Sequence, residues 1–309
     1  MLSPGDLKKI AARAWIHDHD WQLMSLIAGE PFLKDPFLTY WDGKQLSLCT
    51  WPLDKNRMDD DLTHTIEESI HHLLDLFHPL IVDVWGPHPI DMADILPPSF
   101  RPVRRRGLDP HNINLQLDLS DYEIPRGSHL ENARRAARWG YRMRQAAAPG
   151  LTWEHLRLVE DFSRRSDLNE FDRIYTAIEP WMAGTPGTRI FSVYQEDRLL
   201  GFKSMREITH RLVISKSAYY RRGVKHVSDF LNHAIYEYYI DSEFSILDMG
   251  YSGHKKLLDY KRHWKPTIEN GSYQEQVYAY RSYRPDSSYS TWWARDIICP
   301  ALHPSGNDC

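Results

Sequence analysis

The sequence predicts an α/β protein of the α+β type, in which two related halves each carry a mixed, mostly antiparallel sheet with flanking helices. After residue 150 the expected elements follow the order α-α-β-β-β-α-β-α-β, an antiparallel meander that leads into a β-α-β unit. Residues 38–85 repeat part of this order as hairpin, helix and strand. We therefore expect a tandem arrangement in which the N-terminal copy is degenerate.

Each element has its own signal in the chain. Asp42-Gly43 between two runs of aromatic and apolar residues predicts a β-hairpin, and apolar residues at helical spacing predict the helices. In the first half we expect a helix near 7–14, a hairpin over 38–51, a helix over 62–77, a strand over 80–85, a proline-rich irregular connection over 87–110 and a strand over 113–119. In the second half we expect an arginine-rich helix over 128–144, helices over 153–164 and 171–182, strands over 189–195, 199–206 and 211–220, a helix over 227–238, a strand over 244–249, a helix over 252–264 and a strand over 276–281.

The composition is that of a folded globular protein. Of the 309 residues 42% are hydrophobic and 26% charged, which provides enough apolar material for a core. The formal net charge of -4 excludes a global basic field that would attract nucleic acid. Three widely spaced cysteines argue against a disulfide framework, and the N-terminal residues lack the apolar stretch of a signal peptide. With no run of about 18 apolar residues, we expect a cytoplasmic protein without membrane contact.

Three short segments resemble a known family. Lys225-His226-Val227-Ser228-Asp229-Phe230-Leu231 begins a helix, Leu247-Asp248-Met249-Gly250 ends a strand, and Tyr260-Lys261-Arg262-His263-Trp264 closes the next helix. Their order and spacing resemble the C-terminal half of the Fem-type aminoacyltransferases and of related GNAT-superfamily acyltransferases. The resemblance implies a degenerate GNAT-like domain over 1–110, a catalytic GNAT-like domain over 111–285, and a loosely packed tail over 286–309.

The same resemblance implies an enzyme that forms an amide bond. The chain lacks the coiled-coil arm of the bridge-forming members, so the tRNA-dependent enzymes of small-molecule and natural-product pathways are the better guide. We expect transfer of an aminoacyl group from charged tRNA to an amine of a small molecule or peptide, with no further cofactor. The alternatives are an N-acetyltransferase that uses acyl-coenzyme A, and a non-catalytic binding protein on the same scaffold.

The candidate catalytic residues are Lys261, Asp248 and His254. By resemblance Lys261 faces the donor end, where a cation would stabilise developing negative charge. Asp248 ends a buried strand, where side chains that contact ligands tend to emerge, and His254 is a candidate proton acceptor. The candidate substrate-binding residues are Tyr219, Tyr220, Asp229 and Trp264, of which Asp229 can equally cap a helix. We expect the segments around Asp229, Asp248 and Lys261 to meet in one cleft beside a split sheet.

Basic residues are the candidates for binding the donor. Coenzyme-A-dependent GNAT enzymes keep a phosphate-binding loop where this chain has Arg221-Arg222-Gly223-Val224-Lys225. Lys225 replaces a small residue there, which disfavours coenzyme A and suits the sugar-phosphate chain of tRNA better. Arg134, Arg138 and Arg142 recur every four residues, so on a helix they form one stripe that can contact phosphates. His71, Asp75 and His78 have the helical spacing of metal ligands, with His88 nearby, but no metal is expected because neither a cysteine nor a glutamate general base accompanies them.

Overall fold

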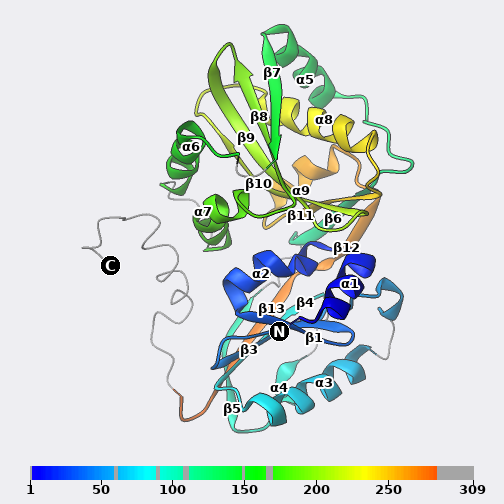
Figure 1. Ribbon diagram of the computed structural model, residues 1–309, viewed down its shortest axis with the longest axis vertical. Helices are drawn as coiled ribbons and strands as arrows, with labels where there is room; N and C mark the ends of the chain where they lie inside the picture. Colours follow the sequence, from blue (N-terminus) through cyan, green and yellow to red (C-terminus); the bar gives the residue numbers. More distant parts are fainter. Residues whose placement is uncertain are drawn as a thin grey trace, which may run out of the picture. The chain divides into compact units, whose positions relative to one another are not determined.

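The computed structural model of the chain describes residues 2–58, 62–87, 91–106, 111–147, 150–164 and 170–283. The chain divides into two units (Figure 1). The first contains Met1–Gln116, Gly250–Lys261 and the described residues from Ile268 onward, whereas the second contains Leu117–Met249 and Arg262–Thr267. The expected tail over 286–309 lies outside the described residues.

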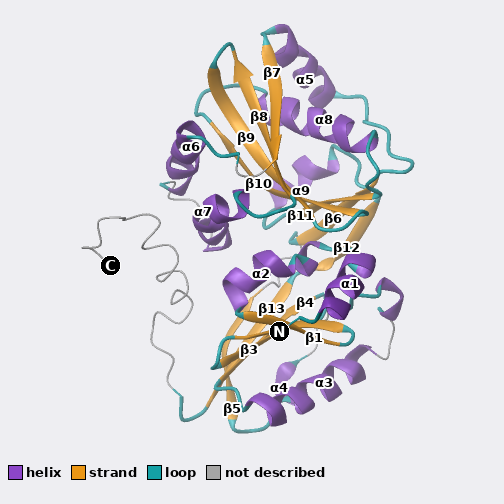
Figure 2. Cartoon of the chain, viewed as in Figure 1, coloured by secondary structure: helices purple, strands orange, loops and turns teal. Residues whose placement is uncertain are grey.

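Helices and strands alternate along the chain, and Figure 2 distinguishes them by colour. The described helices are α1 (Pro4–Arg13), α2 (Trp21–Ala28), α3 (Leu62–Phe77), α4 (Met92–Ile95), α5 (Ser128–Arg138), α6 (Trp153–Ser163), α7 (Glu170–Ala183), α8 (Val227–Ile240) and α9 (Lys255–Arg262), with 3-10 turns η1 (His17–His19) and η2 (Lys55–Arg57). The described strands are β1 (Glu30–Lys34), β2 (Phe37–Trp41), β3 (Gln45–Cys49), β4 (Ile81–Gly86), β5 (Phe100–Arg106), β6 (Ile113–Asp118), β7 (Tyr141–Ala147), β8 (Thr188–Gln195), β9 (Arg198–Glu207), β10 (Leu212–Tyr220), β11 (Ile246–Tyr251), β12 (Ile268–Ser272) and β13 (Gln274–Tyr280).

The described strands form two sheets that repeat one connection. One sheet has the order β1-β2-β3-β4-β13-β5 and the other the order β12-β6-β11-β10-β9-β8-β7. In the first, the antiparallel pair β2-β3 leads through α3 to β4, which lies parallel to β3. In the second, the antiparallel pair β9-β10 leads through α8 to β11, which lies parallel to β10. This shared connection supports the expected tandem arrangement.

The first sheet is buried on the face that α3 covers. The apolar stripe of α3 includes Leu62, Ile66 and Ile70, each at most 1% exposed. These side chains share a core with residues of the sheet, namely Phe37, Leu46, Leu48, Val82, Val84 and Tyr278. The helical spacing of the stripe is the reason that the sequence predicts α3 correctly.

Helices cover both faces of the second sheet, with α6 and α7 on one face and α5 and α8 on the other (Figure 1). Tyr219 and Tyr220 show this division, because consecutive residues of a strand point to opposite faces. The ring of Tyr219 contacts Phe162 of α6, and its hydroxyl bonds Glu179 of α7. The hydroxyl of Tyr220 lies 3.4 Å from the Oγ of Ser228 in α8.

Two expectations about secondary structure are wrong. The connection over 87–110 contains α4 and β5, and β5 tolerates Pro102 because it lies at the edge of its sheet. The helix expected over 128–144 ends at Arg138, because Gly140 adopts φ +86°, a left-handed conformation that terminates helices. The residues that follow form β7 and pair with β8.

Candidate functional site

The second sheet opens between β10 and β11. The two strands pair only from Leu212↔Ile246 to Ile214↔Asp248, although β10 continues to Tyr220. Directly beyond this pairing, the register between β10 and β9 shifts between Ser215 and Ala218. Such a bulge takes backbone groups out of the ladder. Backbone N–H groups released in this way can hold the oxygen of an acyl group and the oxyanion that develops from it.

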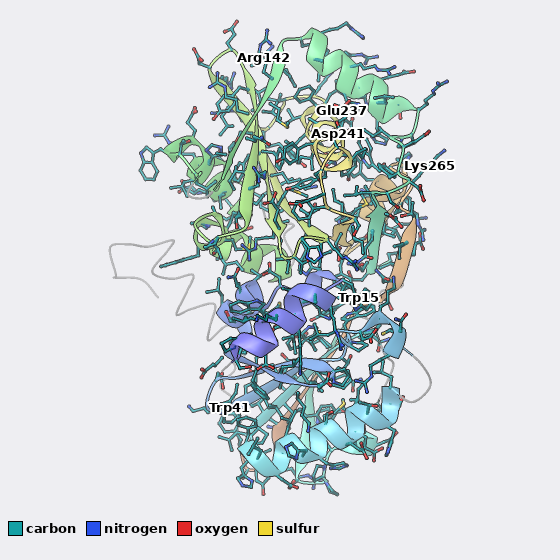
Figure 3. All side chains as sticks on the ribbon, turned by 45° about the vertical axis from the view of Figure 1, so that its right-hand side comes forward. Trp15, Trp41, Arg142, Glu237, Asp241 and Lys265 are labelled. Carbon is teal, nitrogen blue, oxygen red and sulfur yellow. The ribbon has the colours of Figure 1, made fainter. Side chains whose placement is uncertain are left out.

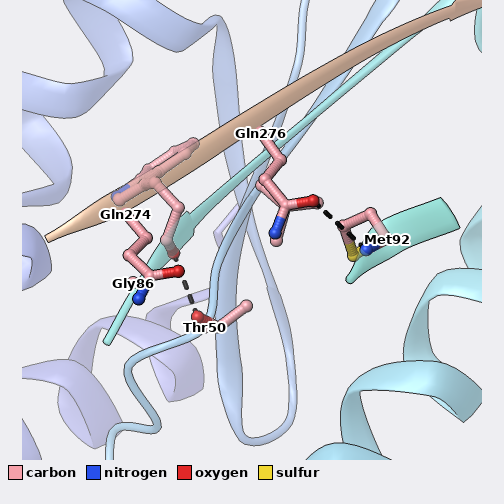
Figure 4. A pocket seen from close by; sticks show the side chains of 7 residues that line it. Thr50, Gly86, Met92, Gln274 and Gln276 are labelled. Atoms are coloured by element: carbon pink, nitrogen blue, oxygen red, sulfur yellow. Dashed lines mark hydrogen bonds between the residues drawn. The ribbon is translucent and has the colours of Figure 1, made fainter. Parts of the chain in front are cut away.

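The corresponding strands of the first sheet remain closed. All five residues of β3 pair with β4, from Gln45↔Ile81 to Cys49↔Trp85. Beyond the last pair, the Oγ1 of Thr50 donates a hydrogen bond to the carbonyl oxygen of Trp85 at 3.1 Å (Figure 4). The hollow at this point has a volume of about 10 Å³, room for one water molecule. The N-terminal copy therefore offers no space for an acyl donor between these strands.

A buried carboxylate lies on the α6 and α7 face of the second sheet. Glu179 of α7 is fully buried, and it accepts hydrogen bonds from the hydroxyls of Ser204 and, at 3.2 Å, Tyr219. Burial raises the pKa of Glu179 to about 7, against the opposing effect of these two bonds and of Lys216. A carboxylate with this pKa can accept a proton near neutral pH. Glu179 cannot be predicted from the sequence, because a single acidic residue in an amphipathic helix carries no motif.

Asp248 lies on the same face as Tyr219. The sheet register aligns Arg206 of β9 with Ile214 of β10, and Ile214 with Asp248 of β11. Paired residues point to the same side of a sheet, and Arg206 bonds Thr188 beneath α7. Asp248 and Arg206 are at most 2% exposed. The structure thus brings Asp248 and Tyr219 to one buried polar face together with Glu179.

Asp229 and Trp264 belong to the opposite side of the second unit. The carboxylate of Asp229 accepts hydrogen bonds from the Nδ1 of His129 at 2.6 Å and the Nδ2 of Asn132 at 2.9 Å, which joins α8 to α5. The ring of His129 lies 5.5 Å from that of Trp264, which is completely buried. Both side chains therefore have structural roles in packing α5 against its neighbours. Asp229 does not share a face with Asp248.

A second buried titratable group lies beneath α8. The ammonium group of Lys203 in β9 donates to the Oδ1 of Asn232 at 2.9 Å, and burial lowers the pKa of Lys203 to about 8. Lys203 is not among the site residues that the sequence predicts. Its position directly after Leu199-Leu200-Gly201-Phe202 in a strand was the one available signal, because a lysine there faces either solvent or a specific partner.

Lys261 and His254 lie in the first unit, around α9. The Nζ of Lys261 is largely buried and donates to the carbonyl oxygens of Gly250 at 2.8 Å and Tyr251 at 2.7 Å. It therefore places a cation at the carboxyl end of β11. His254 is exposed, and its Nδ1 accepts a hydrogen bond from the backbone N–H of Leu257, as a helix cap does.

The basic candidates do not form the expected stripe. Arg134 and Arg138 lie on α5, whereas Arg142 lies on β7, near the top of the view in Figure 3. Arg134 lines an open hollow of about 360 Å³ at the start of α5, together with Arg126, Gly127, Leu130 and Glu131. In the loop before α8, Arg221 lies 3.6 Å from Glu154, and Arg222 and Lys225 are exposed.

Neither a metal site nor a membrane span occurs in the part of the chain that the structure describes. Among these residues, no three histidine, cysteine, aspartate or glutamate side chains gather as metal ligands would. His71 instead lies 3.8 Å from Glu67, and His88 is outside the described residues. None of the described helices combines the length and the apolar character needed to cross a bilayer.

Comparison with known proteins identifies the fold. The sequence matches no protein family and no curated protein. Among solved structures, a conserved protein of unknown function from Bacteroides thetaiotaomicron has a TM-score of 0.55 at 15% identity, over 90% of this chain and 98% of its own. L-PGS from Bacillus licheniformis has a TM-score of 0.53 at 15% identity, over 96% and 97%. The C-terminal domain of a putative lysylphosphatidylglycerol synthetase from Agrobacterium fabrum has 0.50 at 12% identity, over 95% and 97%.

These likenesses extend over nearly the whole chain, so they concern both sheets rather than one. At identities of 12–15% they establish the fold alone. Together with the repeated hairpin, helix and parallel strand in each sheet, they confirm the expected mixed α/β fold. The chain thus shares the fold of L-PGS from Bacillus licheniformis, with a hairpin, a helix and a parallel strand repeated in each of its two sheets.

Proposed function

We propose that the protein is an N-acyltransferase that moves an aminoacyl group from charged tRNA to the amine of a small molecule or peptide. The observation that carries this proposal is the opening of the sheet between β10 and β11, with the bulge of β10 beside it. The equivalent pair in the first sheet is closed, so the opening is specific to one copy. The fold shared with L-PGS is in keeping with aminoacyl chemistry.

The residues beside the opening suit the chemistry of amide formation. The amine nitrogen attacks the carbonyl carbon of the aminoacyl ester, and the oxyanion that forms receives hydrogen bonds from backbone N–H groups of the bulge. The ester oxygen leaves with the tRNA, and the amine loses a proton as the amide forms. Glu179, with its pKa near 7, is the proton acceptor on this face, and the hydroxyl of Tyr219 or Ser204 connects it to the site.

The donor assignment rests on the loop between β10 and α8. Arg222 and Lys225 are exposed there, and two free cations suit the phosphates of an RNA chain. The test is product formation by the purified protein with charged tRNA or with acyl-coenzyme A as donor. We expect amide product with charged tRNA that ribonuclease abolishes. Activity that survives ribonuclease and requires acyl-coenzyme A would overturn the assignment.

A coenzyme-A-dependent acetyltransferase is the second candidate, and Gly223 favours it. This residue has φ +78°, and no atom lies within 4 Å of the position that a Cβ would occupy, so the loop has room for a pyrophosphate. Coenzyme A would then raise the melting temperature of the protein, because a ligand that binds only the native state stabilises it. Charged tRNA would have no such effect.

A further inference from the structure

Two aromatic side chains, one exposed and one half-buried, form a step where the end of α5 meets the start of α8. Trp139 follows α5 and is 43% exposed, and His226 precedes α8. Their ring centroids lie 5.3 Å apart with the planes inclined by 39°. Two hydrogen bonds hold the loops in place, from the Nε2 of Gln195 to the carbonyl oxygen of Trp139 at 2.9 Å and from the hydroxyl of Tyr141 to the carbonyl oxygen of Lys225 at 3.2 Å. The step is therefore formed in advance of any ligand.

Three exposed cations lie close to this step in the chain. Arg138 adjoins Trp139, Lys225 adjoins His226, and Arg222 lies four residues before His226. All three are exposed, and none forms an ion pair with another described residue. Arg142 belongs to the opposite face of the sheet, because its register partner Tyr194 packs against α6 whereas the neighbouring Tyr141 contacts α8. Arg144 and Arg221 are partly neutralised, since Arg144 lies 3.8 Å from Asp197 and Arg221 lies close to Glu154. The chain as a whole has a net charge of -4, so the positive charge is local.

We propose that this surface binds an unpaired nucleotide of RNA, with a base stacked on Trp139 and the adjoining phosphates held by Arg138, Arg222 and Lys225. The inference rests on the proposed function, which makes tRNA the donor, and it adds which side chains bind that RNA. Exposed aromatic faces beside cations are the means by which proteins hold single-stranded nucleic acid, because every base has a π face and every nucleotide a phosphate.

The choice of RNA over an anionic membrane follows from the exposed apolar side chains. In the described part of the second unit, the large hydrophobic side chains with the highest exposure are Trp139, Trp153 and Trp181, all tryptophans. A surface that enters a bilayer presents large aliphatic side chains as well, and none is exposed in the described part of this unit. Stacking requires only the aromatic ring.

The experiment measures binding of two uncharged RNA hairpins, one blunt and one with four unpaired nucleotides at its 3′ end. The variants are Trp139→Ala, Trp139→Phe and Arg222→Ser. We expect the overhang to strengthen binding to the unaltered protein by about tenfold, in line with the stacking of one base. Trp139→Ala should remove that gain, and Trp139→Phe should retain part of it. Arg222→Ser should weaken both hairpins equally and reduce the slope of log K against log salt by about one.

Trp181→Ala is the matched control. Trp181 is more exposed than Trp139, at 62%, but it lies in the last turn of α7, before β8 begins, whereas Gln195 beside Trp139 ends β8. We expect no change in the affinity for either hairpin. Thermal unfolding of each variant shows whether a loss of binding reflects a loss of folding.

The outcomes separate this inference from the proposed function. The inference is overturned if the unaltered protein binds neither hairpin, if the overhang gain persists in Trp139→Ala, or if Trp139→Ala reduces binding to anionic lipid vesicles and not to RNA. If the protein forms amide from charged tRNA but Trp139→Ala keeps the overhang gain, the proposed function holds and the stacking on Trp139 does not. If the overhang gain depends on Trp139 but no aminoacyl transfer occurs, the stacking on Trp139 holds and the proposed function does not.

Discussion

The two faces of the second sheet differ in the polar side chains that they carry and so in the chemistry that they suit. The α6 and α7 face carries Glu179, Ser204 and Tyr219 in one hydrogen-bonded group. The opposite face carries Asp229, whose carboxylate joins two helices. The hydrogen bonds of Asp229 join α8 to α5, and an aspartate at a helix start gives no indication in the sequence of whether it caps, packs or binds a ligand. The strand register places Asp248 on the α6 and α7 face, whereas Asp229 lies on the side of α5 and α8.

Glu179 makes stability depend on pH in a defined window. Its pKa is about 7 in the folded protein and 4.5 as the ordinary value, so folding favours the protonated form. The stabilisation is fully present below pH 4.5 and is lost as the pH rises to about 7, with a loss of the order of 3 kcal/mol. Glu179→Gln should remove this slope, as measured by urea unfolding at pH 5 and pH 8.

The unaltered protein and Glu179→Gln must be compared because other groups titrate in the same pH range. His19 and His155 have pKa values lowered to about 4 by burial, so each contributes stability that is lost as the pH falls below its ordinary pKa of 6.5. These two effects oppose that of Glu179 and are shared by both proteins. Equal pH dependence in the unaltered protein and in Glu179→Gln would show that Glu179 has no raised pKa.

At the scale of elements, local signals were reliable wherever one face of an element meets a core. The stripe of α3 and the Asp42-Gly43 hairpin between β2 and β3 were predicted because their patterns repeat over several residues. The strands β1, β5, β7 and β12 were missed, and each depends on a partner distant in sequence or follows an unexpected break. The helix predicted over 128–144 continues past Gly140 because arginines keep a helical spacing beyond the residue where α5 ends.

The end of α5 at Gly140 leads to a stability prediction. Gly140 has φ +86°, and no atom lies within 4 Å of a Cβ built on it, so the conformation is the only obstacle to a side chain. Gly140→Ala should therefore reduce the free energy of unfolding by about 1 kcal/mol, and Gly140→Asn by less, because asparagine tolerates this region better. Chemical denaturation measures both. The reverse order of the two variants would show that crowding rather than backbone strain governs this position.

At the scale of the whole molecule, the same connection occurs in both sheets, but its last two strands stay paired in the first sheet and separate in the second. In both sheets an antiparallel pair leads through a helix to a parallel strand, and both last strands carry an aspartate, Asp83 in β4 and Asp248 in β11. The sequence indicated the repeat and its eroded first copy from element order alone. It could not indicate that β3 and β4 stay paired while β10 and β11 separate, because pairing across strands depends on the bulge of β10 and on side chains from distant segments.

Hydrogen exchange of backbone amides tests this asymmetry. In β3 the residues Leu46, Ser47 and Leu48 lie between two paired strands, whereas beyond Ile214 about half of the amides of β10 point away from β9 toward the opening. Amides of residues 215–220 should therefore exchange at least about tenfold faster than those of residues 46–48. A bound acyl donor should slow exchange in β10 and leave β3 unchanged, because only the second sheet has an edge that a donor can occupy. Equal protection of the two strands without donor, or slowing in β3, would mean that the opening is not the feature that distinguishes the second sheet from the first.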